Sequence, residues 1–181
     1  MKKDISNKRI SKSYWLWLQI SKEDEKKLQK IKNIINKKLK GPKFNIHLTL
    51  IGPYLKLKHN DFKLLKNISR KIRKFKIRLI KYELTNEKYT SFNIKVKKTK
   101  ELNQVREKFL ETNYIKQNLK YNPHISLYYG EKDIKTKKRI ISKLPKLNKS
   151  VTVDKVSIVD VNEKINKWKI IKRIKLSEKK N

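Results

Sequence analysis

One seven-residue pattern occurs twice in this chain, and that duplication restricts the possible folds more than any other feature. Residues 44–50 run Phe-Asn-Ile-His-Leu-Thr-Leu, and residues 121–127 run Tyr-Asn-Pro-His-Ile-Ser-Leu. Both copies have the order aromatic, Asn, variable, His, apolar, hydroxyl, Leu. Most of the three glycines and four prolines flank or enter these segments, namely Gly41, Pro42, Gly52, Pro53, Pro123 and Gly130. Because Gly and Pro mark turns, the pattern predicts two short, equivalent strands with defined ends.

The histidines of the pattern are difficult to attribute to chance. The chain has three histidines, and two of them, His47 and His124, have a hydroxyl residue two positions later. Ser and Thr together are 18 of 181 residues, so chance would produce both matches about once in a hundred cases. The third, His59, lies in a polar stretch, where we expect a surface residue or the start of a helix. The sequence therefore points to His47 and His124 as a functional pair.

Hydrophobic periodicity predicts that the chain consists of two similar halves. The first half has strand-like residues 14–20, 44–51 and 75–84, with helices at 22–40 and 60–73. The second half has strand-like residues 89–96, 124–129, 151–161 and 168–174, with helices at 101–113 and 132–144. The first helix places Leu28, Ile31, Ile34 and Ile35 at helical spacing for a buried face. Both halves thus repeat the order strand, helix, motif strand, helix, strand.

These elements predict an α+β protein with two pseudo-symmetric lobes. Each lobe is expected to be a mainly antiparallel sheet with helices on its outer face and the functional cleft between the sheets. The length fits a single domain, which we assign to residues 13–176. Residues 1–12 form a basic N-terminus that we expect to be disordered, and residues 177–181 form a C-terminal tail.

Side-chain alternation along the two motif strands predicts the chemistry. His47 and Thr49 share one strand face, as do His124 and Ser126, while the intervening apolar residues face a packed layer. A neutral imidazole can take a proton from water while an imidazolium opposite donates one to a departing oxygen. Two hydroxyls beside them can bind the non-bridging oxygens of a phosphate. The arrangement suits hydrolysis of a phosphate ester, although a lone strand histidine more often has a structural role.

Several classes of chemistry are excluded or disfavoured. The chain has no cysteine, which removes disulfides, cysteine metal sites and thiol nucleophiles. Two histidines without a convincing His, Asp or Glu cluster supply too few ligands for zinc, so we expect no metal and no cofactor. No apolar run approaches the ~20 residues that cross a bilayer. The basic and then apolar N-terminus imitates a signal peptide but lacks a small-residue cleavage site, so we expect a cytoplasmic protein without a membrane partner.

The charge favours a polyanionic partner without identifying it. The chain has 51 Lys and Arg against 16 Asp and Glu, a net charge of +35. Such a charge attracts nucleotides or RNA. Compositional bias explains it equally well, because 44 of the 51 cations are Lys and they are spread along the chain. Both explanations stay open, and the sequence does not set the oligomeric state.

Taken together, these residues resemble the two-histidine phosphoesterase superfamily, whose defining pattern is two His-apolar-Thr/Ser motifs. Within it, the chain is most similar to the cyclic phosphodiesterases of plants and yeast. The similar features outside the motifs are residues 14–17, residues 41–44, Tyr129 and Trp168. The resemblance spans residues 14–176 and implies a bilobal, LigT-like fold. Ile46 departs from the pattern, because relatives often have proline there. The residue at which the first motif strand begins is therefore undecided.

The resemblance implies a metal-independent cyclic phosphodiesterase that acts on small cyclic-phosphate nucleotides. Such enzymes hydrolyse nucleoside 2',3'-cyclic phosphates to 2'-phosphates and ADP-ribose 1'',2''-cyclic phosphate, a by-product of tRNA splicing, to ADP-ribose 1''-phosphate. The catalytic residues carry over as His47 and His124, with Thr49 and Ser126 as phosphate ligands and Tyr129 beside them. The sequence does not decide which histidine is the base and which the acid; we favour His124 as the group that activates water and His47 as the one that protonates the leaving oxygen.

Aromatic residues could complete the site. Trp15 and Trp17 share one strand face with Gln19, and a tryptophan in the cleft, for which we name Trp17, could stack on a nucleobase. Packing in the core explains both tryptophans equally well. Trp168 is expected in the core, and the places of Tyr54 and Tyr128 are left open.

Two alternative functions remain. The same chemistry could act on longer RNA, by trimming or ligating RNA ends or by cleaving 2',5'-linked or cyclic oligonucleotides. In the other alternative, the protein is a basic RNA-binding module without catalytic activity. Hydrolysis of a cyclic nucleotide separates the enzymes from the binding module.

Overall fold

The seven strands that the structure describes belong to one antiparallel, hydrogen-bonded network that closes on itself. The computed structural model describes residues 13–54, 57–112, 121–162 and 164–178; the predicted N-terminal segment 1–12 lies outside them. The strands are β1 (Ser13–Ile20), β2 (Leu48–Tyr54), β3 (Phe75–Leu84), β4 (Phe92–Val96), β5 (His124–Tyr128), β6 (Ser150–Val161) and β7 (Lys169–Lys175). Their order is β1-β2-β5-β4-β3-β6-β7, and β6 also pairs with β1. β6 thereby joins both ends of a six-strand ring, and β7 is added at its side.

The connectivity of this ring has an internal symmetry. When β1 is exchanged with β4, β2 with β5 and β3 with β6, every pairing of the ring becomes another pairing of the same ring. The central pairing, between β2 and β5, links the two halves of the chain. The α+β class and the antiparallel pairing are as predicted. A division into two pseudo-symmetric lobes stays a prediction.

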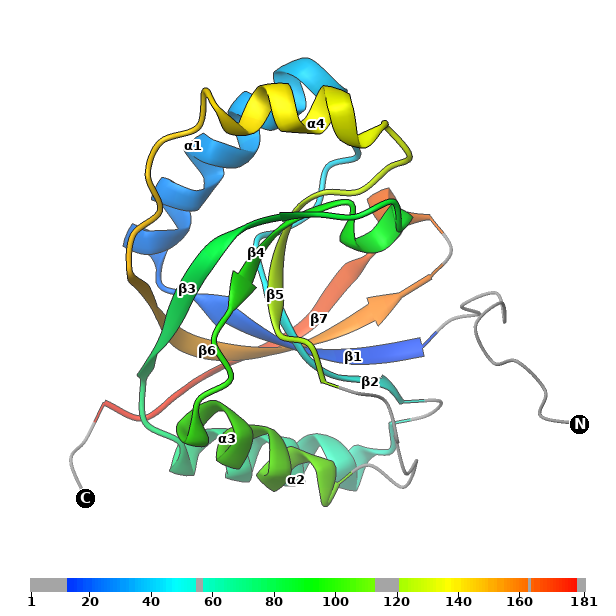
Figure 1. Ribbon diagram of the computed structural model, residues 1–181. Coiled ribbons are helices and arrows are strands. Elements are labelled where there is room, and N and C mark those ends of the chain that lie inside the picture. The colour runs from blue at the N-terminus through cyan, green and yellow to red at the C-terminus, as the bar shows by residue number, and fades with distance from the viewer. Residues whose placement is uncertain (1–12, 55–56, 113–120, 163, 179–181) are drawn as a thin grey trace, which may run out of the picture.

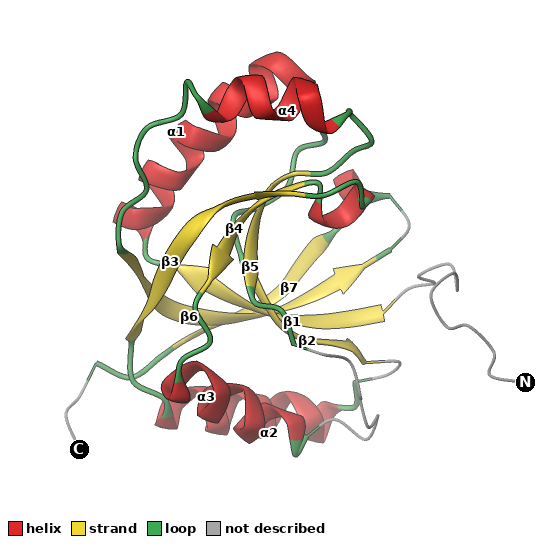
Figure 2. Ribbon diagram, viewed as in Figure 1, coloured by secondary structure: helices red, strands yellow, loops and turns green. Residues whose placement is uncertain are grey.

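Four described helices flank the sheet in two pairs. They are α1 (Lys22–Leu39), α2 (His59–Lys71), α3 (Lys100–Leu110) and α4 (Ile134–Ile141), with short 3-10 turns η2 (Lys88–Thr90) and η3 (Ile165–Lys167). α1 and α4 lie on one side of the strands, while α2 and α3 lie on the opposite side (Figures 1 and 2). Each helix that precedes a motif strand packs on the other half: α1 contacts β5, and α3 contacts β2. The helices therefore fasten the two halves together.

The local sequence explains how α1 begins and ends. Ser21 caps its N-terminus by accepting a hydrogen bond from the Asp24 amide, and acidic residues occupy the first turn, where they complement the helix dipole. It ends at Lys40, which adopts a left-handed conformation. The predicted buried face differs at one position. Ile34 is 37% exposed, and Lys32 is buried instead.

Alternating strand residues separate a large core from a small one. The even-numbered residues Leu16, Leu18 and Ile20 of β1 point into the large core beneath the helices. The odd-numbered Trp15 and Trp17 point to the opposite face, where Val159, Val161 and Trp168 pack with them. This second face, away from the helices, is where the candidate site lies.

Two predicted strand boundaries differ from the structure. The first motif strand was expected from residue 44, but β2 begins at Leu48, so His47 directly precedes it. The first two residues of the predicted strand 89–96 belong instead to the turn η2, and β4 begins at Phe92. In the first segment, the Lys32 ammonium of α1 donates to the Phe44 carbonyl, so this carbonyl is bonded to a side chain instead of a neighbouring strand. His59 begins α2, in agreement with its predicted place at a helix start.

A substitution in the central pairing should be costly. Ile125 is fully buried in the large core, so Ile125→Ala is expected to lower the free energy of unfolding by about 2–5 kcal/mol. Ile171→Ala is the matched control, because Ile171 also lies in a strand but is 42% exposed; its effect should stay within about 0.5 kcal/mol. Urea denaturation measures both. Equal losses in the two variants would contradict this packing.

Candidate active site

One backbone pairing brings the two histidine motifs side by side. The register between β2 and β5 pairs Leu48 with Ile125, which are the middle residues of the two motifs. In an antiparallel pair the sum of paired residue numbers is constant, so the register sets His47 beside Ser126 and Thr49 beside His124. Leu48 and Ile125 point into the large core, so the histidines and hydroxyls lie on the opposite face.

A cavity of about 220 Å³ lies on this face and is lined by both histidines. Thr49 and Tyr129 also line it. Ser126 does not belong to the lining; it is buried beneath, within hydrogen-bonding reach of the Tyr129 hydroxyl. The structure thus brings together the residues singled out in the sequence. Ser126 contacts Tyr129 but does not itself line the cavity.

The backbone fixes the tautomer of both imidazoles in the same way. His47 Nδ1 lies 2.7 Å from the Asn45 carbonyl oxygen, and His124 Nδ1 lies 2.8 Å from the Asn122 carbonyl oxygen. A carbonyl can only accept, so each Nδ1 carries the hydrogen and donates it. Each neutral ring therefore has its lone pair on Nε2, which is free to exchange a proton with a ligand.

The two histidines differ in their surroundings. His47 is buried, and Trp17 stacks on its ring face to face, with centroids 3.5 Å apart and planes 8° from parallel. His124 is only partly buried. Burial lowers the pKa of His47 to about 3, and the positive charge of Lys32 contributes in the same direction. In the free protein His47 is therefore a neutral base at physiological pH.

Lys32 is a buried cation next to this ring. Its side chain is 1% exposed, and its ammonium donates to the Phe44 carbonyl and sits over the Phe44 ring, 3.1 Å from the centroid. Burial lowers the pKa of Lys32 to about 7. Among the residues that the structure describes, no carboxylate is paired with it. Its contacts hold the segment that leads into His47, a role that the sequence pattern did not reveal because lysine is so frequent.

Tyr129 lies at the centre of an aromatic cluster behind the cavity. Its ring stacks on Phe44, with centroids 4.1 Å apart, and meets Tyr89 and Trp168 edge to face at 5.9 and 5.7 Å. Burial raises the pKa of Tyr129 to about 12, so its hydroxyl stays protonated. A protonated hydroxyl can donate to an anionic oxygen, which suits the predicted place of Tyr129 beside a phosphate.

Three further aromatic residues line the cavity, of which only Tyr89 was not considered from the sequence. Trp15 and Tyr89 contribute to its wall. Trp168 packs against the small core, in agreement with its predicted place, and it also lines the cavity, because β7 runs beside β6 and brings it edge to face with Trp17 at 5.7 Å. Trp15 lies directly over Gly52, where an added Cβ would be 2.3 Å from the indole. By contrast, Tyr54 and Tyr128 are both buried in the large core.

The described residues contain neither a cluster of metal ligands nor a membrane-spanning helix. In the described ranges, no three His, Asp or Glu side chains come together in a way that could hold a metal ion. None of the four described helices is long and apolar enough to cross a membrane.

Comparison with known proteins agrees with this geometry. A model of the 2'-5' RNA ligase superfamily matches residues 23–164, which is more than half of the chain. The chain belongs to this superfamily. It is therefore a member of the LigT-like two-histidine phosphoesterases, although no curated protein matches it significantly. The resemblance to the superfamily is thereby confirmed, and the narrower likeness to the cyclic phosphodiesterases stays a prediction.

Solved structures share the fold of this superfamily member. LigT of E. coli in its apo form aligns with a TM-score of 0.59 at 15% identity, over 92% of this chain and 98% of LigT. TT0787 of Thermus thermophilus aligns with a TM-score of 0.62 at 13% identity, over 93% of this chain and all of TT0787. E. coli LigT has also been crystallised with 3'-AMP and with ATP. At such low identities, the likeness establishes the fold alone.

Removing the charge of Lys32 should change the titration of His47. Lys32→Met is expected to raise the pKa of His47 toward the ordinary value of 6.5, because a positive charge that disfavours the imidazolium is lost. An NMR titration of the imidazole signals measures this shift. Lys30→Met, which removes the same charge from an exposed position of α1, is the matched control and should leave the pKa of His47 unchanged. A His47 curve that stays in place or moves to lower pH would contradict the assigned role of the charge.

Proposed function

We propose that this superfamily member is a metal-independent cyclic phosphodiesterase. Its expected reactions are hydrolysis of nucleoside 2',3'-cyclic phosphates to 2'-phosphates, of ADP-ribose 1'',2''-cyclic phosphate to ADP-ribose 1''-phosphate, or both. The observation that supports this most is the cavity lined by both histidines, each with its Nδ1 bonded to a carbonyl and its Nε2 left for a ligand. A bilobal arrangement around this cavity is part of the same proposal.

The chemistry requires one proton acceptor and one proton donor. In the reaction of a 2',3'-cyclic phosphate, the oxygen of water attacks phosphorus while one imidazole Nε2 takes its proton. The bond between phosphorus and O3' breaks, and the other imidazole, protonated at Nε2, gives its proton to O3'. The products are a 2'-phosphate and a free 3'-hydroxyl, and the two imidazoles have exchanged their protonation states.

The phosphate ligands are assigned to the hydroxyl groups beside the imidazoles. Thr49 lines the cavity next to His124 in the register of the two strands, and Tyr129 lines it with a protonated hydroxyl. Both can donate to the non-bridging oxygens as charge develops there. Ser126 shares a hydrogen bond with the Tyr129 hydroxyl. We therefore assign it an indirect role in phosphate binding, through Tyr129.

The environments of the two imidazoles favour an assignment opposite to the one expected from the sequence. His47 is neutral in the free protein, because burial lowers its pKa to about 3, and a neutral imidazole is the form that accepts a proton. His124 is more exposed, so carrying a positive charge there costs less desolvation. We therefore assign His47 as the base that activates water and His124 as the acid.

Loss of either histidine should abolish hydrolysis. His47→Ala and His124→Ala are each expected to lower kcat for 2',3'-cyclic AMP by about 10²–10⁴-fold in the presence of EDTA. His59→Ala is the matched control and should retain full activity, since His59 lies on α2, away from the cavity lining. Circular dichroism checks that the variants are folded. A wild-type protein that binds RNA but hydrolyses no cyclic phosphate would instead support the non-catalytic alternative.

A substrate with a better leaving group tests which imidazole is the acid. In an analogue of 2',3'-cyclic AMP that has sulfur at the 3' position, the departing thiolate needs no proton. His124→Ala should then regain most of its lost activity on the analogue, while His47→Ala stays inactive on both substrates. The reverse pattern would restore the assignment that the sequence suggested, with His124 as the base.

Action on RNA ends or on 2',5'-linked oligonucleotides is the second candidate function. The net charge of +35 favours it, because lysines that neutralise the phosphates of a longer substrate release the counterions condensed around that substrate. The family description as 2'-5' RNA ligases points the same way. The chemistry at the two histidines would be shared, and only the length of the substrate would differ.

A further inference from the structure

The turn η2 contributes a hydroxyl residue to the histidine cavity that belongs to neither motif. Thr90, the last residue of η2, lines the cavity together with Thr49 of the first motif. Ser126, the hydroxyl residue of the second motif, does not line it. Tyr89 of η2 is also a wall residue, and its ring meets Tyr129 edge to face. The lining therefore has one threonine from a motif strand and one from the turn between β3 and β4.

A second threonine holds the side chain of Thr90. The hydroxyl oxygens of Thr85 and Thr90 are 3.0 Å apart, and either can be the donor. Thr85 Oγ1 also accepts from the Glu87 amide at 3.1 Å and lies 3.1 Å from the Thr90 carbonyl oxygen. A hydroxyl has one hydrogen and two lone pairs. When Thr85 donates to Thr90 Oγ1, the hydrogen of Thr90 is left for an anionic oxygen in the cavity.

Buried contacts fix the turn against the face of the sheet that carries the site. Asn93 is 1% exposed, and its Nδ2 donates to the Thr90 carbonyl at 2.8 Å. Asn93 pairs with Ser126 in the register of β4 and β5, so its side chain lies on the face of the motif histidines. The Gly130 amide donates to the Lys88 carbonyl at 3.0 Å. Thr90 is therefore held over the strand that carries the second motif.

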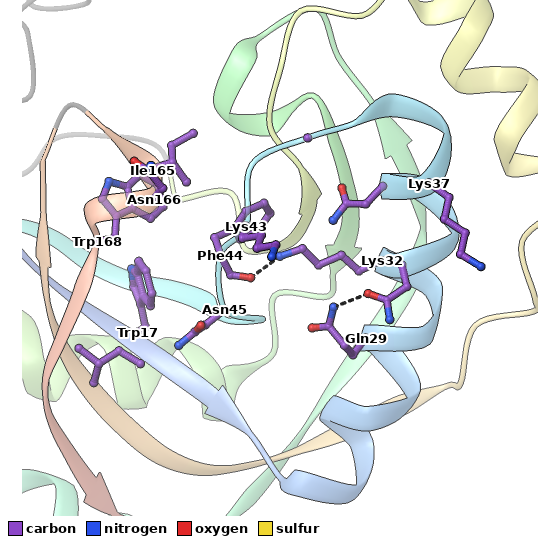
Figure 3. Close-up of a pocket in the computed structure, with 14 residues that line it drawn as sticks. Trp17, Gln29, Lys32, Lys37, Lys43, Phe44, Asn45, Ile165, Asn166 and Trp168 are labelled. Carbon is purple, nitrogen blue, oxygen red and sulfur yellow. Dashed lines mark hydrogen bonds between the residues drawn. The ribbon is translucent and has the colours of Figure 1, made fainter.

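A buried lysine of α4 anchors both ends of the same turn. Lys137 is fully buried, and its ammonium donates to the Thr85 carbonyl at 2.6 Å and to the Ser91 hydroxyl at 3.0 Å. These two acceptors flank η2. A similar contact exists on α1, where the Lys32 ammonium donates to the Phe44 carbonyl in the segment before the first motif strand (Figure 3). Two helices on one side of the sheet thus each hold a backbone segment near the cavity through a buried ammonium.

We propose that Thr90 is a further phosphate ligand of the site and that Lys137 is the positioning residue that holds it there. This inference rests on the proposed function and adds a donor that the His-apolar-hydroxyl pattern does not contain. During hydrolysis the Thr90 hydroxyl accepts from Thr85 and donates to a non-bridging oxygen, beside the donors Thr49 and Tyr129. Lys137 acts only through the turn, because it is fully buried.

The first test removes the hydroxyl of Thr90 and keeps the shape of its side chain. Thr90→Val should lower kcat/KM for 2',3'-cyclic AMP about 10–100-fold, whereas Thr90→Ser, which keeps the hydroxyl, should stay within about threefold of the wild type. A role in packing alone predicts the opposite order, because valine keeps the volume of threonine and serine does not. Thr152→Val is the matched control. Thr152 is a partly exposed strand residue outside the cavity lining, so kcat/KM should not change.

Binding of inorganic phosphate separates this inference from the proposed function. A titration followed by the NMR signals of the imidazoles measures Kd without turnover, and Thr90→Val should raise that Kd about tenfold or more. In an active enzyme, an unchanged kcat/KM in Thr90→Val overturns the role of Thr90 and leaves the proposed function intact. A wild-type protein that hydrolyses no cyclic phosphate overturns the proposed function, and the Kd for phosphate then decides the role of Thr90.

The positioning role of Lys137 is tested through its dependence on Thr90. Lys137→Met donates to neither Thr85 nor Ser91, so kcat/KM should fall about tenfold. In a Thr90→Val background the same change should cost less than about threefold, because the hydroxyl that it positions is already absent. Lys138→Met, at an exposed position of α4, is the matched control and should have no effect in either background. Equal losses in both backgrounds would overturn the positioning role. If Lys137→Met does not fold, Ser91→Ala removes one acceptor and enters the same comparison.

Discussion

The pairing of Leu48 with Ile125 is the constraint on which the rest of the structure depends. It sets the register between β2 and β5, and it lies at the centre of both histidine motifs. Because side chains alternate along strands, burying these two residues in the large core turns His47, Thr49 and His124 to the opposite face. Packing of α1 on β5 and of α3 on β2 holds the two strands together. The same register thus places the apolar motif residues in the core and the candidate catalytic residues on the opposite face.

The site is asymmetric although the motifs that build it are equivalent. Both imidazoles bond a carbonyl two residues earlier through Nδ1, so the backbone treats them alike. The surroundings do not: Trp17 covers His47, and Lys32 lies close enough to lower its pKa, while His124 is partly exposed. A proton transfer between two groups needs one that is neutral and one that is charged. Unequal burial of the two side chains and the charge of Lys32 together make their environments different.

The prediction of elements from the sequence succeeded where periodicity was strong and failed where tertiary contacts replaced it. The helix at residues 22–40 and the strand at 75–84 were correctly located, because their apolar spacing is regular. The strand expected from residue 44 begins only at Leu48, since the Lys32 ammonium bonds the Phe44 carbonyl. On α1, Lys32 is buried and Ile34 is exposed. The sequence could not predict the burial of one particular lysine, because the chain has 44 of them. Trp168 packs against the small core as expected, but only the position of β7 decides that it also lines the cavity.

The sequence by itself determined that two His-apolar-hydroxyl strands exist and which faces their side chains share, because alternation is a property of the extended backbone. It also determined the superfamily, because that pattern is local. Only the tertiary structure decided that the two strands are neighbours, that the ring of strands closes through β6, and that both histidines line one cavity. These features depend on contacts between segments distant along the chain, and neither composition nor periodicity specifies which distant segments will meet.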